Sequence, residues 1–222
     1  MVLARTIHVF IKLIPVILAL RKDRILWISQ EGKNVDEKRF RRNAQRVLNT
    51  CISLGPVFIK FGQWLSSRAD ILPQPYLEEL SKLQDSVPAV PFEKVRPIIE
   101  EDIGNIKEKF DDLDQNSLSG ASLGQVHLAT KNGQKVIVKV KRPGIEKQVE
   151  KDLKVLMKII PFAMKFVDPN LRFSIIPIMK QFVDSIHEEM DYSKESENLK
   201  KIKKNMEPVS YTHLTLPTNR EV

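Results

Sequence analysis

The sequence predicts an α+β fold, with helices in its first half and a small antiparallel sheet followed by two long helices. Through the first hundred residues, apolar side chains recur at spacings of three and four, which is the period of an amphipathic helix. From about Phe110, the helical period gives way to short runs in which apolar and polar residues alternate, and an Asn-Gly pair separates two of these runs. This pattern is typical of strands joined by a tight turn. With 42% hydrophobic and 29% charged residues, the 222-residue chain has the composition of a folded protein.

We expect residues 1–50 to form a basic amphipathic helical segment. The apolar stretch at residues 7–20 is similar to a membrane span, but it contains Lys12 and is shorter than the roughly 20 residues that a spanning helix needs. No small-residue cleavage site follows it, so a signal peptide is not expected. Two alternatives remain open: a helix that lies in a membrane interface, or an ordinary helix packed on the protein.

The basic charge is concentrated in this first segment. Residues 1–50 carry +7 of the total net charge of +8, which favours contact with a polyanion. The neighbouring apolar residues favour membrane lipids as this partner. We do not expect nucleic-acid binding, because the basic cluster at residues 38–46 has Phe40 as its only aromatic residue for base stacking. The single cysteine, Cys51, excludes an intrachain disulfide and indicates a reducing compartment.

A helical extension is predicted for residues 51–108. Helical periodicity runs from Asp36 to about Ser67 with an interruption at Gly55-Pro56, and it resumes after Pro75. A short helix over residues 92–103 is then closed by a glycine.

Residues 109–208 are predicted to hold the sheet and the two long helices, at about 145–166 and 174–205. Asn132-Gly133 fits a type I′ hairpin turn, in which both central residues have positive φ. On the strand that follows, Val136, Val138 and Val140 share one face, while Ile137, Lys139 and Lys141 share the other.

A candidate phosphate-binding site combines a loop of small residues with a strand lysine. Residues 119–126, called here the small-residue loop, have the spacing of the kinase glycine-rich loop, and small side chains there let backbone N–H groups approach phosphates. Lys139 follows in Val136-Ile-Val-Lys139, which is similar to the V-A-I-K strand of kinases. The candidate nucleotide-binding residues are Ser119, Gly120, Ala121, Ser122, Leu123, Gly124, Gln125, Val126, Ile137 and Lys139.

A phosphate-binding lysine needs an acidic partner, which kinases supply from a helix after the third strand. In a continuous helix over 174–205, Glu188, Asp191 and Glu195 lie on one stripe, whereas Glu189 projects away from Asp191. Spacing alone does not choose among these carboxylates.

Four motifs in order resemble the UbiB or AarF-domain (ABC1-type) family of atypical kinases. They are Lys60-Phe-Gly-Gln63, the small-residue loop with His127, Val138-Lys-Val140 with Arg142-Pro-Gly144, and Glu189-Met-Asp191 through Glu195. The resemblance implies a helical N-terminal extension followed by a protein-kinase-like N-lobe, with the C-lobe missing.

The resemblance also implies roles for residues of the motifs. Lys139 would contact the α- and β-phosphates of ATP and Glu195 would pair with it as the second catalytic residue. Lys60 and Gln63 would reach toward Glu189 and Asp191 as regulatory residues. Magnesium is expected with ATP, but its ligands would lie in the missing C-lobe, so no metal ligand is assigned.

Two departures from the family pattern bear on nucleotide preference. Ser119 and Gly120 replace the usual first alanines of the loop, which weakens the restraint of an alanine-rich loop. Ile137 stands where many kinases have alanine and would narrow the space above the adenine.

The resemblance implies an intact parent that is an ATP-binding atypical kinase or ATPase in a prokaryote. We expect it at the cytoplasmic, inner face of the cell membrane, supporting isoprenoid-quinone biosynthesis or lipid homeostasis together with quinone-biosynthesis proteins. We expect the present fragment to be inactive by itself. The alternative is a non-catalytic lipid-interaction scaffold that keeps the kinase-like shape.

The final segment, residues 209–222, is predicted to be non-native. Its sequence looks like one reading frame of a sequencing adapter, and it has no helical or alternating apolar period. We expect native sequence to end near Pro208 and the tail to be extended and exposed.

Overall fold

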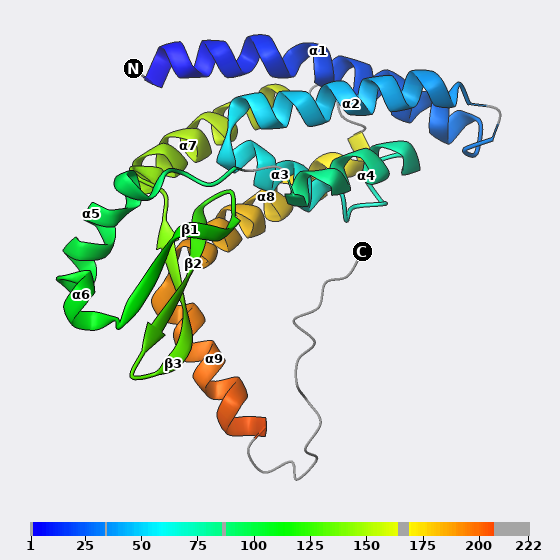
Figure 1. Ribbon diagram of the computed structural model, residues 1–222. Coiled ribbons are helices and arrows are strands. Elements are labelled where there is room, and N and C mark those ends of the chain that lie inside the picture. The colour runs from blue at the N-terminus through cyan, green and yellow to red at the C-terminus, as the bar shows by residue number, and fades with distance from the viewer. Residues whose placement is uncertain (1, 34, 86–87, 164–168, 207–222) are drawn as a thin grey trace. The chain divides into compact units, whose positions relative to one another are not determined.

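The computed structural model describes residues 2–33, 35–85, 88–163 and 169–206, so the predicted non-native tail lies outside the described residues. The chain divides into two compact units, Met1–Val183 and Asp184–Val222. In chain order the elements are α1 (Val2–Ser29), α2 (Glu37–Leu54), α3 (Pro56–Leu65), α4 (Gln74–Ser81), the 3₁₀ helix η1 (Lys82–Asp85), α5 (Phe92–Ile103), α6 (Ile106–Lys109), β1 (Asp112–Gly120), β2 (Gly124–Lys131), β3 (Gln134–Lys141), α7 (Ile145–Ala163), α8 (Pro169–Met190) and α9 (Tyr192–Met206) (Figure 1). The predicted α+β class is confirmed.

A capping residue, a glycine and a proline determine where α2 begins and ends and where α3 begins. The Asp36 carboxylate accepts a hydrogen bond from the Arg39 N–H and caps the start of α2. Gly55 ends that helix with a φ of 99°, a conformation that a side chain disfavours. Pro56 then starts α3 at a position where no backbone donor is needed. The predicted interruption at Gly55-Pro56 is therefore confirmed.

The first helices pack around a core of large apolar side chains. Phe40, Val57, Tyr76, Leu80 and Leu83 are at most 1% exposed, and they come from α2, α3, α4 and η1. Burial of this apolar area is the main force that holds these short helices together.

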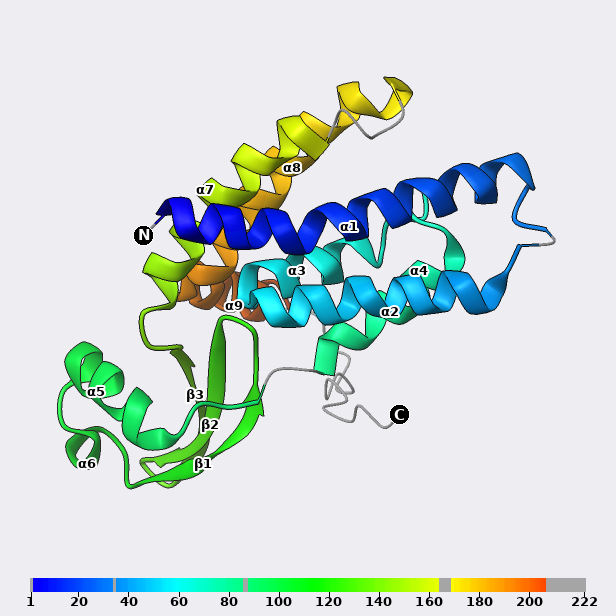
Figure 2. The same cartoon turned by 90° about the horizontal axis from the view of Figure 1, so that it is seen from above.

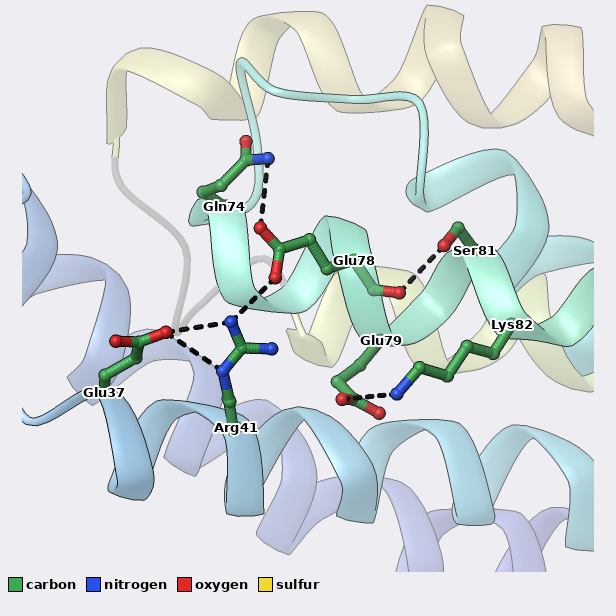
Figure 3. A network of polar contacts seen from close by, with 7 residues as sticks. All are labelled: Glu37, Arg41, Gln74, Glu78, Glu79, Ser81 and Lys82. Carbon is green, nitrogen blue, oxygen red and sulfur yellow. Dashed lines mark hydrogen bonds and ion pairs between the residues drawn. The ribbon is translucent and has the colours of Figure 1, made fainter.

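Polar contacts line the border between α2 and α4 (Figure 3). The Arg41 guanidinium bonds the Glu37 carboxylate at 2.8 Å and reaches Glu78 of α4 at 2.9 Å. Because these groups are largely exposed, their ion pairs contribute little to stability.

Helix α1 lies along α2 and also contacts α7 (Figure 1, Figure 2). It continues through the charged run at residues 21–24 to Ser29, so the expectation that this segment is too short to span a membrane is wrong. By length and composition Leu3–Ser29 could cross one. Two internal ion pairs nevertheless fix α1 to the protein, as the packed-helix alternative predicts. Arg5 bonds Asp152 of α7 at 2.8 Å, and Asp23 bonds Arg39 of α2 at 2.6 Å.

The sheet has the antiparallel order β1-β2-β3. Asn132 and Gly133 have φ angles of 52° and 73° between the paired residues Lys131 and Gln134, which confirms the predicted type I′ turn. Helix α5 covers one face, where Val140 packs with Val95 and Ile99. The predicted alternation of faces on β3 is confirmed.

The helix predicted over residues 174–205 is broken. It consists of the end of α8 and of α9, with Asp191 between them. The Asp191 carboxylate accepts a hydrogen bond from the Lys194 N–H at 3.1 Å, and its carbonyl accepts from the Glu195 N–H. Asp191 therefore starts a new helix. The continuous helix on which the predicted stripe of Glu188, Asp191 and Glu195 depends is therefore interrupted at Asp191.

Candidate functional site

The small-residue loop comprises the end of β1, a tight turn at residues 121–123 and the start of β2. Ser119 pairs with Val126 and Gly120 pairs with Gln125, and the Ala121 N–H donates to the Gly124 carbonyl at 2.9 Å. At the tip, Ser122 and Leu123 are both 3% exposed. The Ser122 Oγ has no hydrogen-bond partner among the described residues. The tip of the loop thus holds a buried hydroxyl group that makes no hydrogen bond to the described residues.

Lys139 lies in register with the base of this loop. On β3 it pairs with Val126, which in turn pairs with Ser119 on β1. The alternation along β3 puts Lys139 on the same face as Ile137, which is 66% exposed. Three strands therefore bring a cation, an exposed apolar side chain and the small-residue loop to one face of the sheet.

Gln125 fixes the chain segment before α5 to β2. Its Oε1 accepts from the Val90 N–H at 2.8 Å, and its Nε2 donates to the Val90 carbonyl at 3.0 Å. The same Nε2 lies 2.9 Å from Nε2 of His127. Since the amide nitrogen can only donate, His127 Nε2 must accept.

His127 is a buried, neutral member of this network. Its Nδ1 lies 2.8 Å from the Asp114 carbonyl, which can only accept, so the proton is on Nδ1. The ring is fully buried and lies edge-to-face with Phe92, with centroids 5.5 Å apart. These contacts give His127 a structural role between β1, β2 and α5.

Arg142 holds the tip of the small-residue loop. Its backbone N–H donates to the Leu123 carbonyl at 3.1 Å, its Nε donates to the Ala121 carbonyl at 2.9 Å, and its Nη2 donates to the Pro88 carbonyl at 2.7 Å. Burial lowers the pKa of the Arg142 guanidinium below its ordinary value. A turn with Pro143 and Gly144 at its centre directs the chain away into α7.

The motif Lys60-Phe-Gly-Gln63 lies on α3. The Gln63 amide donates to the Leu83 carbonyl at 2.9 Å, and Phe61 packs edge-to-face on Phe182 of α8. A Cβ at Gly62 would overlap Leu83 Cδ1 and would lie 3.2 Å from Cys51 Sγ. Glycine is therefore what allows α3 to approach η1 and α2 this closely.

The predicted acidic residues gather in the second unit, around the break between α8 and α9. Glu189 is in the last turn of α8, Asp191 is the break, and Glu195 is in the first turn of α9. Burial, then Glu195 and Glu189, raise the pKa of Tyr192 to about 12. Two of these carboxylates, Glu189 and Glu195, therefore act electrostatically on the Tyr192 phenol. Lys60, Gln63 and Lys139 belong to the first unit, and their pairing with the acidic residues stays a prediction.

Gln125, His127 and Arg142 belong to the predicted motifs, but their binding partners could not be predicted from the sequence. Gln125 and Arg142 contact backbone atoms 35 and 54 positions away, so no local pattern reveals these partners. In the described part of the chain, no three His, Cys, Asp or Glu side chains come together as a metal site would require.

Comparison with known proteins identifies the family. The model of the ABC1 atypical kinase-like domain matches residues 82–219. A probable protein kinase UbiB from Marinobacter nauticus is 41% identical over 156 residues, which are 69% of this chain and 28% of that protein. ACTIVITY OF BC1 COMPLEX KINASE 8, a chloroplastic protein of Arabidopsis thaliana, is 37% identical over 190 residues, which are 82% of this chain and 25% of that protein.

A solved structure, that of Rv3197 with erythromycin from Mycobacterium tuberculosis, aligns with a TM-score of 0.45 and 27% identity over 69% of this chain and 38% of its own. The chain spans about a quarter of the length of the two curated relatives. The family model covers more than half of the chain, and it includes the small-residue loop, Lys139 and the acidic residues around Asp191. The chain therefore belongs to the UbiB/ABC1 family of atypical kinase-like proteins.

Proposed function

We propose that the chain is the nucleotide-binding N-terminal part of an ATP-dependent atypical kinase or ATPase. The observation that carries this proposal is the row formed by Ser119, Val126 and Lys139 across the three strands. A loop of small residues beside a lysine in this order suits a nucleotide phosphate.

Within this site each residue has a distinct task. Lys139 places its ammonium group against the α- and β-phosphates, and Ile137 offers apolar surface to the base. From the resemblance to the family alone, we propose that Glu195 orients Lys139. On the same ground, Lys60 and Gln63 would control access to the nucleotide together with Glu189 and Asp191.

The test is thermal unfolding with and without ATP, in a protein extended to the length of its relatives. We expect saturating ATP to raise Tm, because a ligand that binds only the folded state stabilises it by mass action. Lys139→Ala should abolish the increase. Lys135→Ala is the matched control, since Lys135 lies on the same face of β3 near the hairpin turn. If ATP stabilises the Lys139 and Lys135 variants equally, Lys139 does not bind ATP.

We also propose that α1 attaches the protein peripherally to the inner, cytoplasmic face of a prokaryotic cell membrane. The side of this helix that faces away from the protein carries large apolar side chains, whereas Arg5 and Asp23 bond partners within the protein. The outward residues are Leu3, Ile7, Ile11, Leu18, Ile25 and Ile28, each more than 40% exposed. Nearby cations suit anionic lipid headgroups.

Vesicle sedimentation tests the membrane proposal. The chain should bind vesicles that contain phosphatidylglycerol, and Ile7→Ser with Ile11→Ser should weaken binding about tenfold or more. Ile103→Ser is the control, because Ile103 is exposed on α5 and not on α1. Binding that is unchanged by the α1 substitutions, or that prefers DNA over vesicles, would contradict the proposal.

We propose further that the complete protein supports isoprenoid-quinone biosynthesis or lipid homeostasis. Its similarity to bacterial proteins called UbiB favours this role. The complete protein should restore quinone content in a bacterium that lacks its own UbiB, and Lys139→Ala should not. Restoration by the Lys139→Ala protein would favour the second candidate function, a non-catalytic membrane scaffold. The exposed apolar side chains of α1 are the observation that supports the scaffold function.

A further inference from the structure

We propose that Arg142 and Gln125 are positioning residues that clamp the small-residue loop against residues 88–90, before any nucleotide binds. The consequence for nucleotide affinity rests on the proposed function. The clamp itself rests on hydrogen bonds of the first unit alone.

The two side chains approach the same short segment from two strands. Arg142 extends from the end of β3, and its guanidinium spans the Ala121 and Pro88 carbonyls. Gln125 extends from the start of β2, and its amide satisfies both the N–H and the carbonyl of Val90. Residues 88–90 therefore accept or donate three hydrogen bonds from residues that flank the loop.

The geometry of each side chain is hard to replace. A guanidinium is a planar fork that can bond two carbonyls at once, whereas an ammonium is a point charge. The Gln125 amide offers a donor and an acceptor side by side, as the Val90 backbone requires. Gln125 is also 1% exposed and bonds His127, so it cannot rotate away without leaving buried groups unpaired.

A clamped loop binds phosphate at a lower entropic cost than a free one. A glycine-rich loop must lose backbone freedom when its N–H groups close on a ligand. Here Arg142 already bonds two carbonyls of the loop, those of Ala121 and Leu123. We infer that the clamp compensates for Gly120, the flexible residue that replaces an alanine of the family pattern.

Amide hydrogen exchange on the 222-residue chain tests the clamp without nucleotide. Arg142→Lys keeps the charge and the backbone N–H but removes the fork, and Gln125→Met keeps the length without polar atoms. In both variants, exchange of the Val90 and Ala121 amides should accelerate on the order of tenfold. The Val90 N–H bonds Gln125 and the Ala121 N–H bonds the Gly124 carbonyl, and both bonds should open more often once the clamp loses about one hydrogen bond. Exchange within the β2–β3 ladder should stay unchanged, and this separates local release from general destabilisation.

Arg96→Lys is the matched control, since Arg96 is an exposed arginine of α5 that bonds Glu100. It should leave the exchange of both reporter amides unchanged. Equal exchange at Val90 and Ala121 in Arg142→Lys and wild type would overturn the clamp, as would uniform acceleration across the whole sheet. If Gln125→Met fails to fold, the exchange rates of Arg142→Lys alone decide whether the clamp exists.

Titration with ATP, in the protein extended to the length of its relatives, tests the functional consequence. Arg142→Lys should raise the Kd for ATP severalfold, whereas Arg96→Lys should not. If Arg142→Lys accelerates amide exchange in the loop but leaves the Kd for ATP unchanged, the clamp does not contribute to ATP affinity. Absence of ATP binding in the wild type would instead refute the proposed function, and the exchange result would still decide the clamp.

Discussion

The carboxylate of Asp23, which is completely buried on α1, accepts a hydrogen bond from the Arg39 guanidinium of α2 at 2.6 Å. Asn43 Nδ2 and the Tyr76 hydroxyl donate to its other oxygen at 2.8 and 2.9 Å. Three donors therefore converge on two acceptor atoms. An ionised carboxylate satisfies all three, because it has two oxygens that only accept.

Asp23→Asn should therefore destabilise the protein, although it is nearly isosteric. The amide nitrogen would face a donor, and the Arg39 charge would lose its buried partner. We expect a loss of about 3 kcal/mol in the free energy of unfolding, measured by urea denaturation. Asp36→Asn is the control, since Asn also caps helices well. A loss below about 1 kcal/mol for Asp23→Asn would show that the network does not hold α1.

Gly62→Ala should destabilise the contact between α3 and η1. Alanine is normally favoured over glycine inside a helix, but its Cβ would overlap Leu83 Cδ1, and Leu83 is fully buried. We expect a net loss on the order of 1–3 kcal/mol. In a Leu83→Ala background the same substitution should be neutral or stabilising. A double-mutant cycle by chemical denaturation measures this difference, and additive effects would exclude the overlap.

Features that depend on neighbours in sequence could be predicted from the sequence. The Asn132-Gly133 turn, the alternating faces of β3 and the bounds of α5 all depend on residues within one turn or one strand. The order of the motifs was sufficient to predict the family. The small-residue loop and Lys139 could be placed on adjacent strands because a hairpin leaves little choice of register.

Features that depend on distant contacts could not be predicted. The partner of Arg5 is 147 positions away, and that of Arg142 is 54 positions away. Charged residues on α1 predict an exposed surface, because the sequence does not show that their ion-pair partners lie on α2 and α7. The break at Asp191 was missed for another reason: helical periodicity continues across it, and an aspartate can either cap a helix or sit on its surface.

Stability at alkaline pH should depend on Cys51. Burial raises the pKa of its thiol to about 12. In the unfolded chain the thiol ionises near its ordinary pKa of about 8.5, so the folded state holds the proton more tightly. This stabilisation is complete below the unfolded pKa and is lost as the pH rises toward 12. The free energy of unfolding should fall by up to roughly 1.4 kcal/mol per pH unit from this group.

Denaturation of the wild type and Cys51→Ala between pH 7 and pH 11 checks this prediction. The difference between the two proteins should shrink as the pH rises, because alanine has no proton to lose. The thiol of the folded protein should also react slowly with alkylating reagents. A difference that is constant over this range would contradict the prediction.

Asp191 should act on α9 mainly as a cap, and this role can be separated from that of its charge. Its Oδ1 accepts from the Lys194 N–H at 3.1 Å, while its Oδ2 lies 3.9 Å from the Lys194 ammonium, a weak and exposed pair. Asp191→Ala should accelerate amide exchange at Lys194 and cost about 1 kcal/mol of helix stability. Asp191→Asn should retain the protection, since the asparagine side-chain oxygen also caps.

The same two variants then test the proposed regulatory role of Asp191 in the complete protein. If ATP affinity changes in Asp191→Ala alone, the residue acts by starting α9 and thereby positioning Glu195. If it changes equally in Asp191→Asn, the negative charge itself acts on the site. Normal exchange at Lys194 in Asp191→Ala would show that the break between α8 and α9 does not depend on this side chain, and the capping account would be wrong.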